Sequence, residues 1–337
     1  MSTSSPPSSS TPGGRAPLWG PVLCGAAMAT VGTSVVASKL IGVQIEPFAA
    51  TALRHLLALP VLLLLCVLFR PAWPRPDRRD AWILLMQAAS GSVGYTALLI
   101  AGTAMASAAD AGVVTGTLPA MAALFAIVIL GERPGVAALL GIALATAGVL
   151  LLSAGVGAGQ GKQLPHRGLG IALVTAAVAC EVIFILGQRR LRSTIEPLAM
   201  ATLMSAGGLL LSLPAAAVAW ALGSPRPALG APGQWSALAA IAWYAWVPTV
   251  IGFWLWYAGA RRATATQAAL STAWLPVVAV IGAAAVLGEA LTPTQLMALG
   301  LVLAGAPVGA MPQSAPKLAA LAPPRGGSQP LGAARRG

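Results

Sequence analysis

Charged residues are scarce in this chain of 337 residues. Asp, Glu, Lys and Arg together make up 8% of the sequence, against roughly 25% in an ordinary soluble domain. Apolar residues make up 57%, so the chain lacks the polar side chains needed to cover a soluble core of this size. Lipid is the alternative solvent, because apolar stretches of about 20 residues match a hydrocarbon core about 30 Å thick. We therefore expect an all-α integral membrane protein.

Motifs for catalysis and for cofactor binding are also lacking. The sequence has no GxxxxGK[ST] phosphate loop, no HExxH zinc motif and no GxSxG nucleophile elbow, which argues against a nucleotide-driven motor and an intramembrane hydrolase. With eight acidic residues and two histidines in the whole chain, we expect no metal site, no cofactor and no enzyme. Cys24, Cys66 and Cys180 lie inside apolar stretches without paired spacing, so they are interpreted as packing residues.

The charges that remain are mostly basic and lie in short clusters between the apolar stretches. A net charge of +12 would suggest nucleic-acid binding if the arginines shared one soluble face. Their clustering instead fits membrane topology, and we expect no nucleic-acid partner. Ten basic residues follow even-numbered stretches and four follow odd-numbered ones, which predicts that both termini are cytoplasmic. The ten are Arg70, Arg75, Arg78, Arg79, Arg133, Arg189, Arg190, Arg192, Arg261 and Arg262, and the four are Lys39, Lys162, Arg167 and Arg226.

The apolar stretches predict ten transmembrane helices. Residues 1–17 are rich in Ser and Pro and residues 312–337 in Pro, Ala and Gly, so both are predicted to be disordered cytoplasmic tails, the second of them basic. The ten helices are expected at about residues 18–38, 47–69, 80–102, 107–129, 134–154, 168–188, 197–222, 235–258, 264–287 and 293–311.

The sequence repeats itself after about 150 residues. Pro119 and Glu132 recur as Pro276 and Glu289, each glutamate following Leu-Gly. Five helices per half is an odd number, so the second half must enter the membrane from the opposite side. We expect two inverted five-helix repeats, at residues 18–154 and 168–311, joined by a loop at residues 155–167.

A second repeated motif lies earlier in each half, where Ile45-Glu46-Pro47 recurs as Ile195-Glu196-Pro197. With the twin Leu-Pro and Leu-Gly-Glu segments, the glycine-rich fifth and tenth helices and Arg54 seven residues after Pro47, the chain resembles EamA-type proteins of the drug/metabolite transporter superfamily over about residues 18–311. The resemblance implies a bacterial inner-membrane carrier that works without ATP, usually an exporter of amino acids or other small metabolites. The chain departs from the family at Glu181, where many relatives carry an aromatic or small residue.

Glu181 lies near the middle of the sixth predicted helix. An ionised carboxylate at that depth is costly unless it faces water or a partner. We interpret it as a candidate for substrate binding and for proton coupling, since a carboxyl there can exchange a proton as its surroundings change. The alternative is a permanently protonated packing residue.

Arg54 and His55 lie in the second predicted helix. An arginine keeps its charge, so Arg54 must meet an anion, backbone carbonyls or water. It could clamp a substrate carboxylate, or its side chain could extend to the lipid headgroups. His55 is a further candidate for lining the cavity, although a hydrogen-bonded packing histidine is the simpler interpretation.

Two matched helices, the third and the eighth, contain predicted interruptions at Ser90-Gly91-Ser92 and at Pro248. Interruptions at corresponding places in two repeats indicate a binding site near the middle of the membrane. Tyr95 and Trp254 lie close to these breaks and are candidates for lining a cavity, with lipid-facing aromatics as the alternative.

Several polar residues near helix ends are expected to be structural. Asp110 lies in the first turn of the fourth helix, where an acid is favoured by the helix dipole, and Gln267 occupies the matching position of the ninth and is a cavity candidate. Lys39 is expected to anchor the first helix at the headgroups. Glu132 and Glu289 are expected to hold the start of the helix that follows each of them.

The repeat and the apolar helices predict a secondary transporter that moves a small molecule across a membrane by alternating access. The family resemblance implies a bacterial inner membrane and an exporter of amino acids or related metabolites, with proton coupling as an option. The alternative is a membrane scaffold without transport activity, or a membrane enzyme of unrecognised type. A homodimer is compatible with the sequence.

Overall fold

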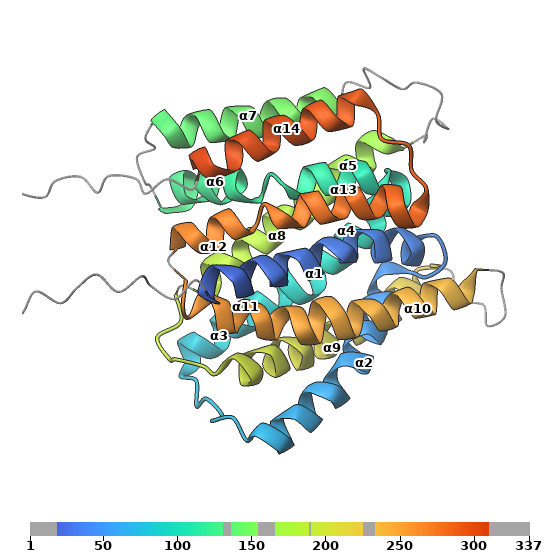
Figure 1. The fold of residues 1–337 in the computed structure, drawn as a ribbon. Coiled ribbons are helices and arrows are strands. Elements are labelled where there is room, and N and C mark those ends of the chain that lie inside the picture. Colours follow the sequence, from blue (N-terminus) through green and yellow to red (C-terminus); the bar gives the residue numbers. More distant parts are fainter. Residues whose placement is uncertain are drawn as a thin grey trace, which may run out of the picture.

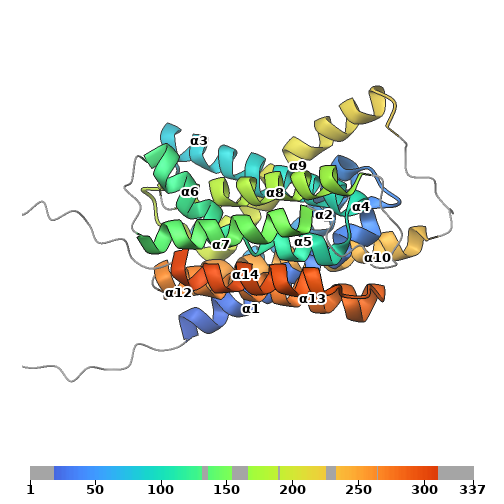
Figure 2. The same ribbon diagram turned by 90° about the horizontal axis from the view of Figure 1, so that it is seen from above.

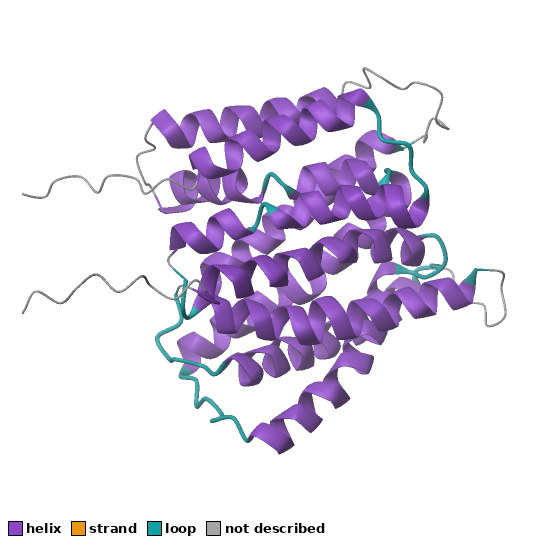
Figure 3. Ribbon diagram, viewed as in Figure 1, coloured by secondary structure: helices purple, strands orange, loops and turns teal. Residues whose placement is uncertain are grey.

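A computed structural model of the chain describes residues 19–130, 136–153, 166–188, 190–224, 233–263 and 265–309, and its regular structure there is helical (Figures 1 and 3). Two segments, η1 and η2, are π-helices. In chain order the elements are α1 (Trp19–Gly42), α2 (Pro47–Phe69), α3 (Arg78–Gln87), η1 (Ala88–Gly94), α4 (Tyr95–Met105), α5 (Ala108–Thr115), α6 (Leu118–Leu130), α7 (Val136–Ser153), α8 (Arg167–Gln188), α9 (Pro197–Ala221), α10 (Gln234–Tyr244), η2 (Ala245–Gly252), α11 (Phe253–Ala260), α12 (Ala265–Ser271), α13 (Trp274–Leu287) and α14 (Pro293–Gly309).

Among the described residues, six continuous helical runs are long and apolar enough to cross a membrane. A seventh candidate is the pair of α5 and α6, which is bent by 44°, and three shorter apolar helices lie within α7, α13 and α14. The chain is therefore a multi-pass membrane protein. Its described part contains six or seven spans by this measure, and the count of ten stays a prediction. The six runs are Trp19–Gly42, Pro47–Phe69, Arg78–Met105, Arg167–Gln188, Pro197–Ala221 and Gln234–Ala260.

The stretch at 107–129, which the sequence predicts as one helix, is divided into α5 and α6 at Gly116 and Thr117. Pro119 is the second residue of α6. A proline fits the first turn of a helix, where its missing N–H would have no partner, but it cannot continue the hydrogen bonding of a preceding helix. The bend therefore follows from the position of this proline.

Matching helices of the two sequence repeats pack against each other. The second helices of the repeats, α2 and α9, are in extensive contact, and so are the last ones, α7 and α14. Figure 1 shows α7 and α14 together at one edge of the bundle and α2 beside α9 at the other. Between these edges, α4 packs closely on α8. The absence of a side chain at Gly170 permits this approach, since a Cβ there would lie 2.8 Å from the Gly102 carbonyl oxygen.

The helices of the bundle run between two ends (Figure 1), and the turns at these ends differ in their basic residues. One end, called here the arginine end, carries the described turns after α2, α8 and α11, together with the start of α1 and the end of α14. The other, called the α5 end, carries the turns before α2, α5 and α14. The described basic turn residues Arg70, Arg75, Arg190, Arg192, Arg261 and Arg262 all lie at the arginine end.

Candidate functional site

The two π-helical segments interrupt matching spans, and their first residues, Ala88 and Ala245, are 157 positions apart. This is also the offset between Pro119 and Pro276. The interruptions predicted at Ser90-Gly91-Ser92 and at Pro248 are confirmed, since both motifs lie inside these segments and are buried. Short π-helices are rare in proteins, and those that occur often lie at functional sites.

Proline causes the interruption in η2. Pro248 has no N–H to donate to the carbonyl four residues earlier, that of Tyr244. The hydroxyl of Thr249 donates to this carbonyl oxygen instead, at 2.9 Å. The backbone therefore opens at η2 without leaving the Tyr244 carbonyl unpaired.

In η1 the backbone carbonyl of Ser92 is bound by α2, because Arg54 Nη2 donates to it at 3.1 Å. Arg54 Nη2 also lies 2.8 Å from His55 Nε2. A guanidinium only donates hydrogen bonds, so this histidine nitrogen must be the acceptor and the ring proton must be on Nδ1. Nδ1 then donates to Ser205 Oγ at 3.2 Å. The contacts fix a neutral His55, and its Nε2, 3.3 Å from Ser92 O, makes no hydrogen bond there.

Arg54 is held deep in the protein, and no carboxylate of the described residues forms an ion pair with it. Its side chain is buried, and the guanidinium carbon lies 4.6 Å from the centroid of the Tyr244 ring. A cation over an aromatic face gains about 2 kcal/mol when both are desolvated. Within the described part of the chain, Arg54 Nε has no hydrogen-bond partner. The arginine is thus ordered and retains hydrogen-bonding capacity for an anion.

Glu181 lies near the middle of α8, where its side chain is partly exposed although the residue is far from both ends of the helix. Within the described residues it makes no hydrogen bond or ion pair. Its carboxylate interacts electrostatically with the side chains of Arg54, Tyr95 and Tyr257. The Glu181 carboxylate and the Arg54 guanidinium therefore share one central region without forming an ion pair.

Aromatic side chains from α8 and α11 continue this region. Phe184, one turn after Glu181, stacks on Phe253 with the ring centroids 6.2 Å apart, and Phe253 contacts Tyr257 at 6.0 Å. Gly91 of η1 is needed beside them, because a Cβ there would lie 2.4 Å from Phe184 Cδ2. The hydroxyl of Tyr257 is buried without a partner in the described structure.

The structure brings together four of the six residues that the sequence suggested as cavity candidates. Arg54 and His55 are bonded to each other, and Tyr95 and Glu181 lie within electrostatic range of Arg54. Trp254 is 50% exposed on α11, and its neighbour Phe253 makes the aromatic contacts instead. Gln267 belongs to α12, which packs on α1 and α14.

Sequence analysis missed five participants, Tyr244, Ser205, Tyr257 and the stacked pair Phe184 and Phe253. Ser205 could have been found from the repeat, since it corresponds to His55 at the offset of 150 that relates Pro47 to Pro197. Tyr244 and Tyr257 belong to an aromatic-rich span, and nothing in their local pattern separates them from lipid-facing tryptophans.

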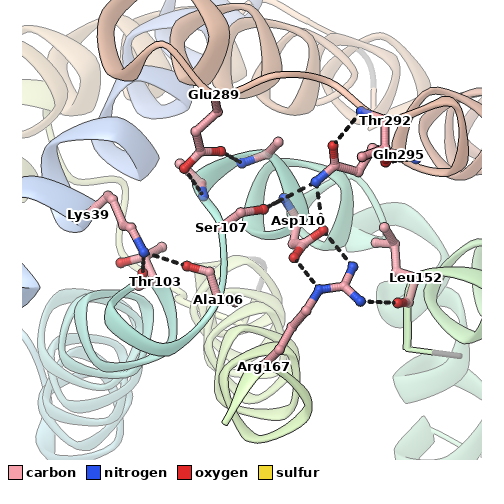
Figure 4. A network of polar contacts seen from close by, with 12 residues as sticks. Lys39, Thr103, Ala106, Ser107, Asp110, Leu152, Arg167, Glu289, Thr292 and Gln295 are labelled. Atoms are coloured by element: carbon pink, nitrogen blue, oxygen red, sulfur yellow. Dashed lines mark hydrogen bonds and ion pairs between the residues drawn. The ribbon is translucent and has the colours of Figure 1, made fainter. Parts of the chain in front are cut away.

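Polar residues near the ends of the helices also depart from expectation (Figure 4). The carboxylate of Glu289 accepts from the backbone N–H groups of Ala108 and Ala109, so it holds the start of α5 in the other repeat. The expectation that it holds the following helix, α14, is wrong. The N-cap of α5 is Ser107. Glu132 lies outside the described residues.

Comparison with known proteins identifies the family. The model of the EamA-like transporter family matches residues 18–154 and 168–308. The uncharacterized transporter YetK of Bacillus subtilis is 32% identical over 280 residues, which cover 83% of each chain. An uncharacterized protein of Pseudomonas aeruginosa is 32% identical over 288 residues, covering 83% of this chain and 90% of that protein.

A solved crystal structure is similar with a TM-score of 0.58 and 21% identity, covering 86% of this chain and 95% of that one, which shows a shared fold. The twin motifs, the two segments matched by the family model and the apolar helices all indicate the same family. The chain belongs to the EamA-like transporter family of the drug/metabolite transporter superfamily and is a multi-pass membrane transporter.

Proposed function

We propose that this transporter exports amino acids or related small metabolites across a bacterial inner membrane by alternating access. Its substrate would bind in a cavity between the two repeats, beside η1 and η2. Freed backbone groups are tolerated at membrane depth only where protein or water covers them. The buried positions of Gly91 and Pro248 support this placement.

The single observation that carries the substrate class is the pair of Arg54 and Glu181. Opposite charges in one apolar region usually pair directly, since each is costly alone. Here Arg54 contacts a backbone carbonyl and an aromatic face, while Glu181 has no hydrogen-bond partner in the described structure. A small zwitterion, with its carboxylate toward Arg54 and its ammonium group toward Glu181, would satisfy both charges.

The proposed topology has ten transmembrane helices in two inverted repeats. The six long runs, the bent α5–α6 pair and the shorter helices in α7, α13 and α14 support this number. The start of α1 and the end of α14, where the described part of the chain begins and ends, both lie at the arginine end of the bundle (Figure 1). Because basic turns are retained in the cytoplasm, we assign the arginine end to the cytoplasmic side.

The test is uptake and efflux in proteoliposomes over a panel of amino acids, other zwitterions, carboxylates and amines. We expect a zwitterion to be transported, and Arg54→Lys to raise its KM at least tenfold because a lysine lacks the bidentate fork. Glu196→Gln is the control, since Glu196 is an exposed residue before α9 whose side chain makes no cap bond. Transport of amines or carboxylates alone would contradict the proposed substrate class.

A further inference from the structure

The α5 end of the bundle is closed, whereas the corresponding helices separate at the arginine end. α5 packs along α13 so closely that a Cβ added at Gly112 would lie 3.0 Å from Ala279 Cβ. No comparable packing joins α6 to α12 in the described parts of the chain, and Figure 2 shows these two helices well apart. By pseudo-symmetry the two pairs are equivalent, so the structure has an asymmetric conformation.

An ion pair lies at the closed end (Figure 4). Arg167, the first residue of α8, donates from Nε to Asp110 Oδ2 at 2.8 Å and from Nη2 to Asp110 Oδ1 at 2.9 Å. Its third nitrogen, Nη1, donates to the Leu152 carbonyl oxygen near the end of α7 at 2.9 Å. Asp110 is almost fully buried, while the arginine side chain is 30% exposed. Two parallel bonds to a buried carboxylate form a strong, directional contact.

Further bonds connect the same turn of α5 to the second repeat. Gln295 Nε2 donates to Asp110 Oδ1 at 2.9 Å, and the Glu289 carboxylate accepts from the N–H groups of Ala108 and Ala109, both at 2.9 Å. On the other side, Lys39 Nζ donates to the carbonyls of Thr103 and Ala106, where α4 ends. These contacts do more than cap one helix, because they join α5 to α8, α13 and α14.

The matching position in the second repeat differs in charge. Asp110 corresponds to Gln267 at the offset of 157. A glutamine is neutral and cannot form an ion pair, so the bridge of the α5 end has no counterpart of the same kind at Gln267. This difference gives the two ends unequal contacts, although the repeats share a fold.

We propose that the bridge from Asp110 to Arg167 and Gln295 is a latch that holds the α5 end closed and has to break when this end opens. The latch shifts the conformational equilibrium toward the state that is open at the arginine end. A contact made in one state only shifts a two-state equilibrium by its own free energy. The inference rests on the proposed alternating access, and its test needs no substrate.

The test measures how fast a membrane-impermeant maleimide labels a cysteine at position 283, applied from the side of the α5 end. Ala283 is fully buried on α13, one turn from Ala279, which lies beside Gly112 of α5. Separation of α5 from α13 is therefore expected to expose it to the reagent. The reporter Ala283→Cys is made with Cys24, Cys66 and Cys180 replaced by serine or alanine. We expect Asp110→Asn or Arg167→Gln to raise the labelling rate about tenfold, which corresponds to about 1.4 kcal/mol.

The matched control is Asp80→Asn. Asp80 is a buried carboxylate at the arginine end that accepts from Ser193 N and Oγ, at 3.0 and 2.7 Å. Its loss should leave labelling at position 283 unchanged or slower. If Asp110→Asn fails to fold, Arg167→Lys keeps the charge but loses the parallel bonds and should give a smaller increase. Unchanged labelling in the folded Asp110 and Arg167 variants would overturn the latch.

The latch and the proposed transport can fail separately. Faster labelling in a protein that transports no member of the substrate panel would support the latch and contradict the proposed substrate. Normal transport with unchanged labelling would leave the transporter function intact and reduce the bridge to a static structural contact.

Discussion

His55 Nδ1 and Ser205 Oγ lie 3.2 Å apart, although 150 residues separate them in the sequence. The same offset relates Pro47 to Pro197, the first residues of α2 and α9. The two residues therefore occupy equivalent positions of the repeats and meet each other. Equivalent positions can touch only near the axis that relates the two repeats, so this hydrogen bond lies near that axis.

The contact at the axis is tight, which predicts the effect of Gly208→Ala. A Cβ at Gly208 would lie 2.4 Å from His55 Nε2, so the ring would have to leave its hydrogen bonds. We expect a loss of about 1–3 kcal/mol of stability, the range for overpacking a core, measured by thermal unfolding in detergent. The control is Gly300→Ala in α14, where a Cβ meets nothing within 4 Å, and it should be neutral or stabilising by about 0.5–1 kcal/mol.

Removing His55 should be more costly than removing its partner. Ser205→Ala leaves the Nδ1–H of His55 without its acceptor, which should lower the free energy of unfolding by about 1 kcal/mol. His55→Phe also removes an acceptor from Arg54 Nη2. Because that group is charged, this second loss should lower the free energy of unfolding by a further amount of about 1.5–3 kcal/mol. Chemical or thermal unfolding of both variants in one detergent checks the order. A Ser205 variant less stable than the His55 variant would contradict the tautomer assigned here.

Gly91→Ala tests whether the π-helical segment positions the aromatic region. The added methyl would displace Phe184 and with it the stacking on Phe253. We expect kcat/KM for the transported substrate to fall roughly tenfold or more, as small displacements in a binding site do. Gly168→Ala at the start of α8, where a Cβ meets nothing within 4 Å, should transport normally. Equal activity of both variants would argue against a site beside η1.

Glu181→Gln tests proton coupling. The amide is close in shape to a protonated carboxyl, but it can neither release a proton nor pair with an ammonium group. We therefore expect the variant to fold, to transport with a raised KM, and to lose its dependence on pH. The measurement is efflux from proteoliposomes over a range of pH, with and without a pH gradient. Transport with an unchanged pH profile would exclude Glu181 as the proton-coupling residue.

The orientation is tested by labelling single cysteines from outside intact cells. Val43→Cys lies in the exposed turn between α1 and α2 at the α5 end, and Trp73→Cys lies in the exposed turn between α2 and α3 at the arginine end. Because basic turns face the cytoplasm, position 43 should react and position 73 should not. Reaction at position 73 alone would reverse the proposed topology.

The sequence by itself was enough to show that the protein lies in a lipid bilayer, that its fold is helical and that it contains a repeat. Few charges and long apolar stretches leave lipid as the only medium that can cover the chain. The helix breaks at residues 90–92 and 248 were also predictable, because glycine and proline act on their own backbone. The repeat could even have paired His55 with Ser205, had the offset been followed from Pro47.

Only the tertiary structure decided which side chains meet. Tyr244 under Arg54 and Phe253 beside Phe184 depend on how α2, α8 and the eighth span pack, and in lipid that packing leaves no polar pattern in the sequence. Glu289 is the clearest example. Its position before α14 suggested that it caps the next helix, but its carboxylate binds α5, about 180 residues earlier in the chain. A glutamate beside a helix start caps whichever start the fold brings within 3 Å, and local spacing does not specify that partner.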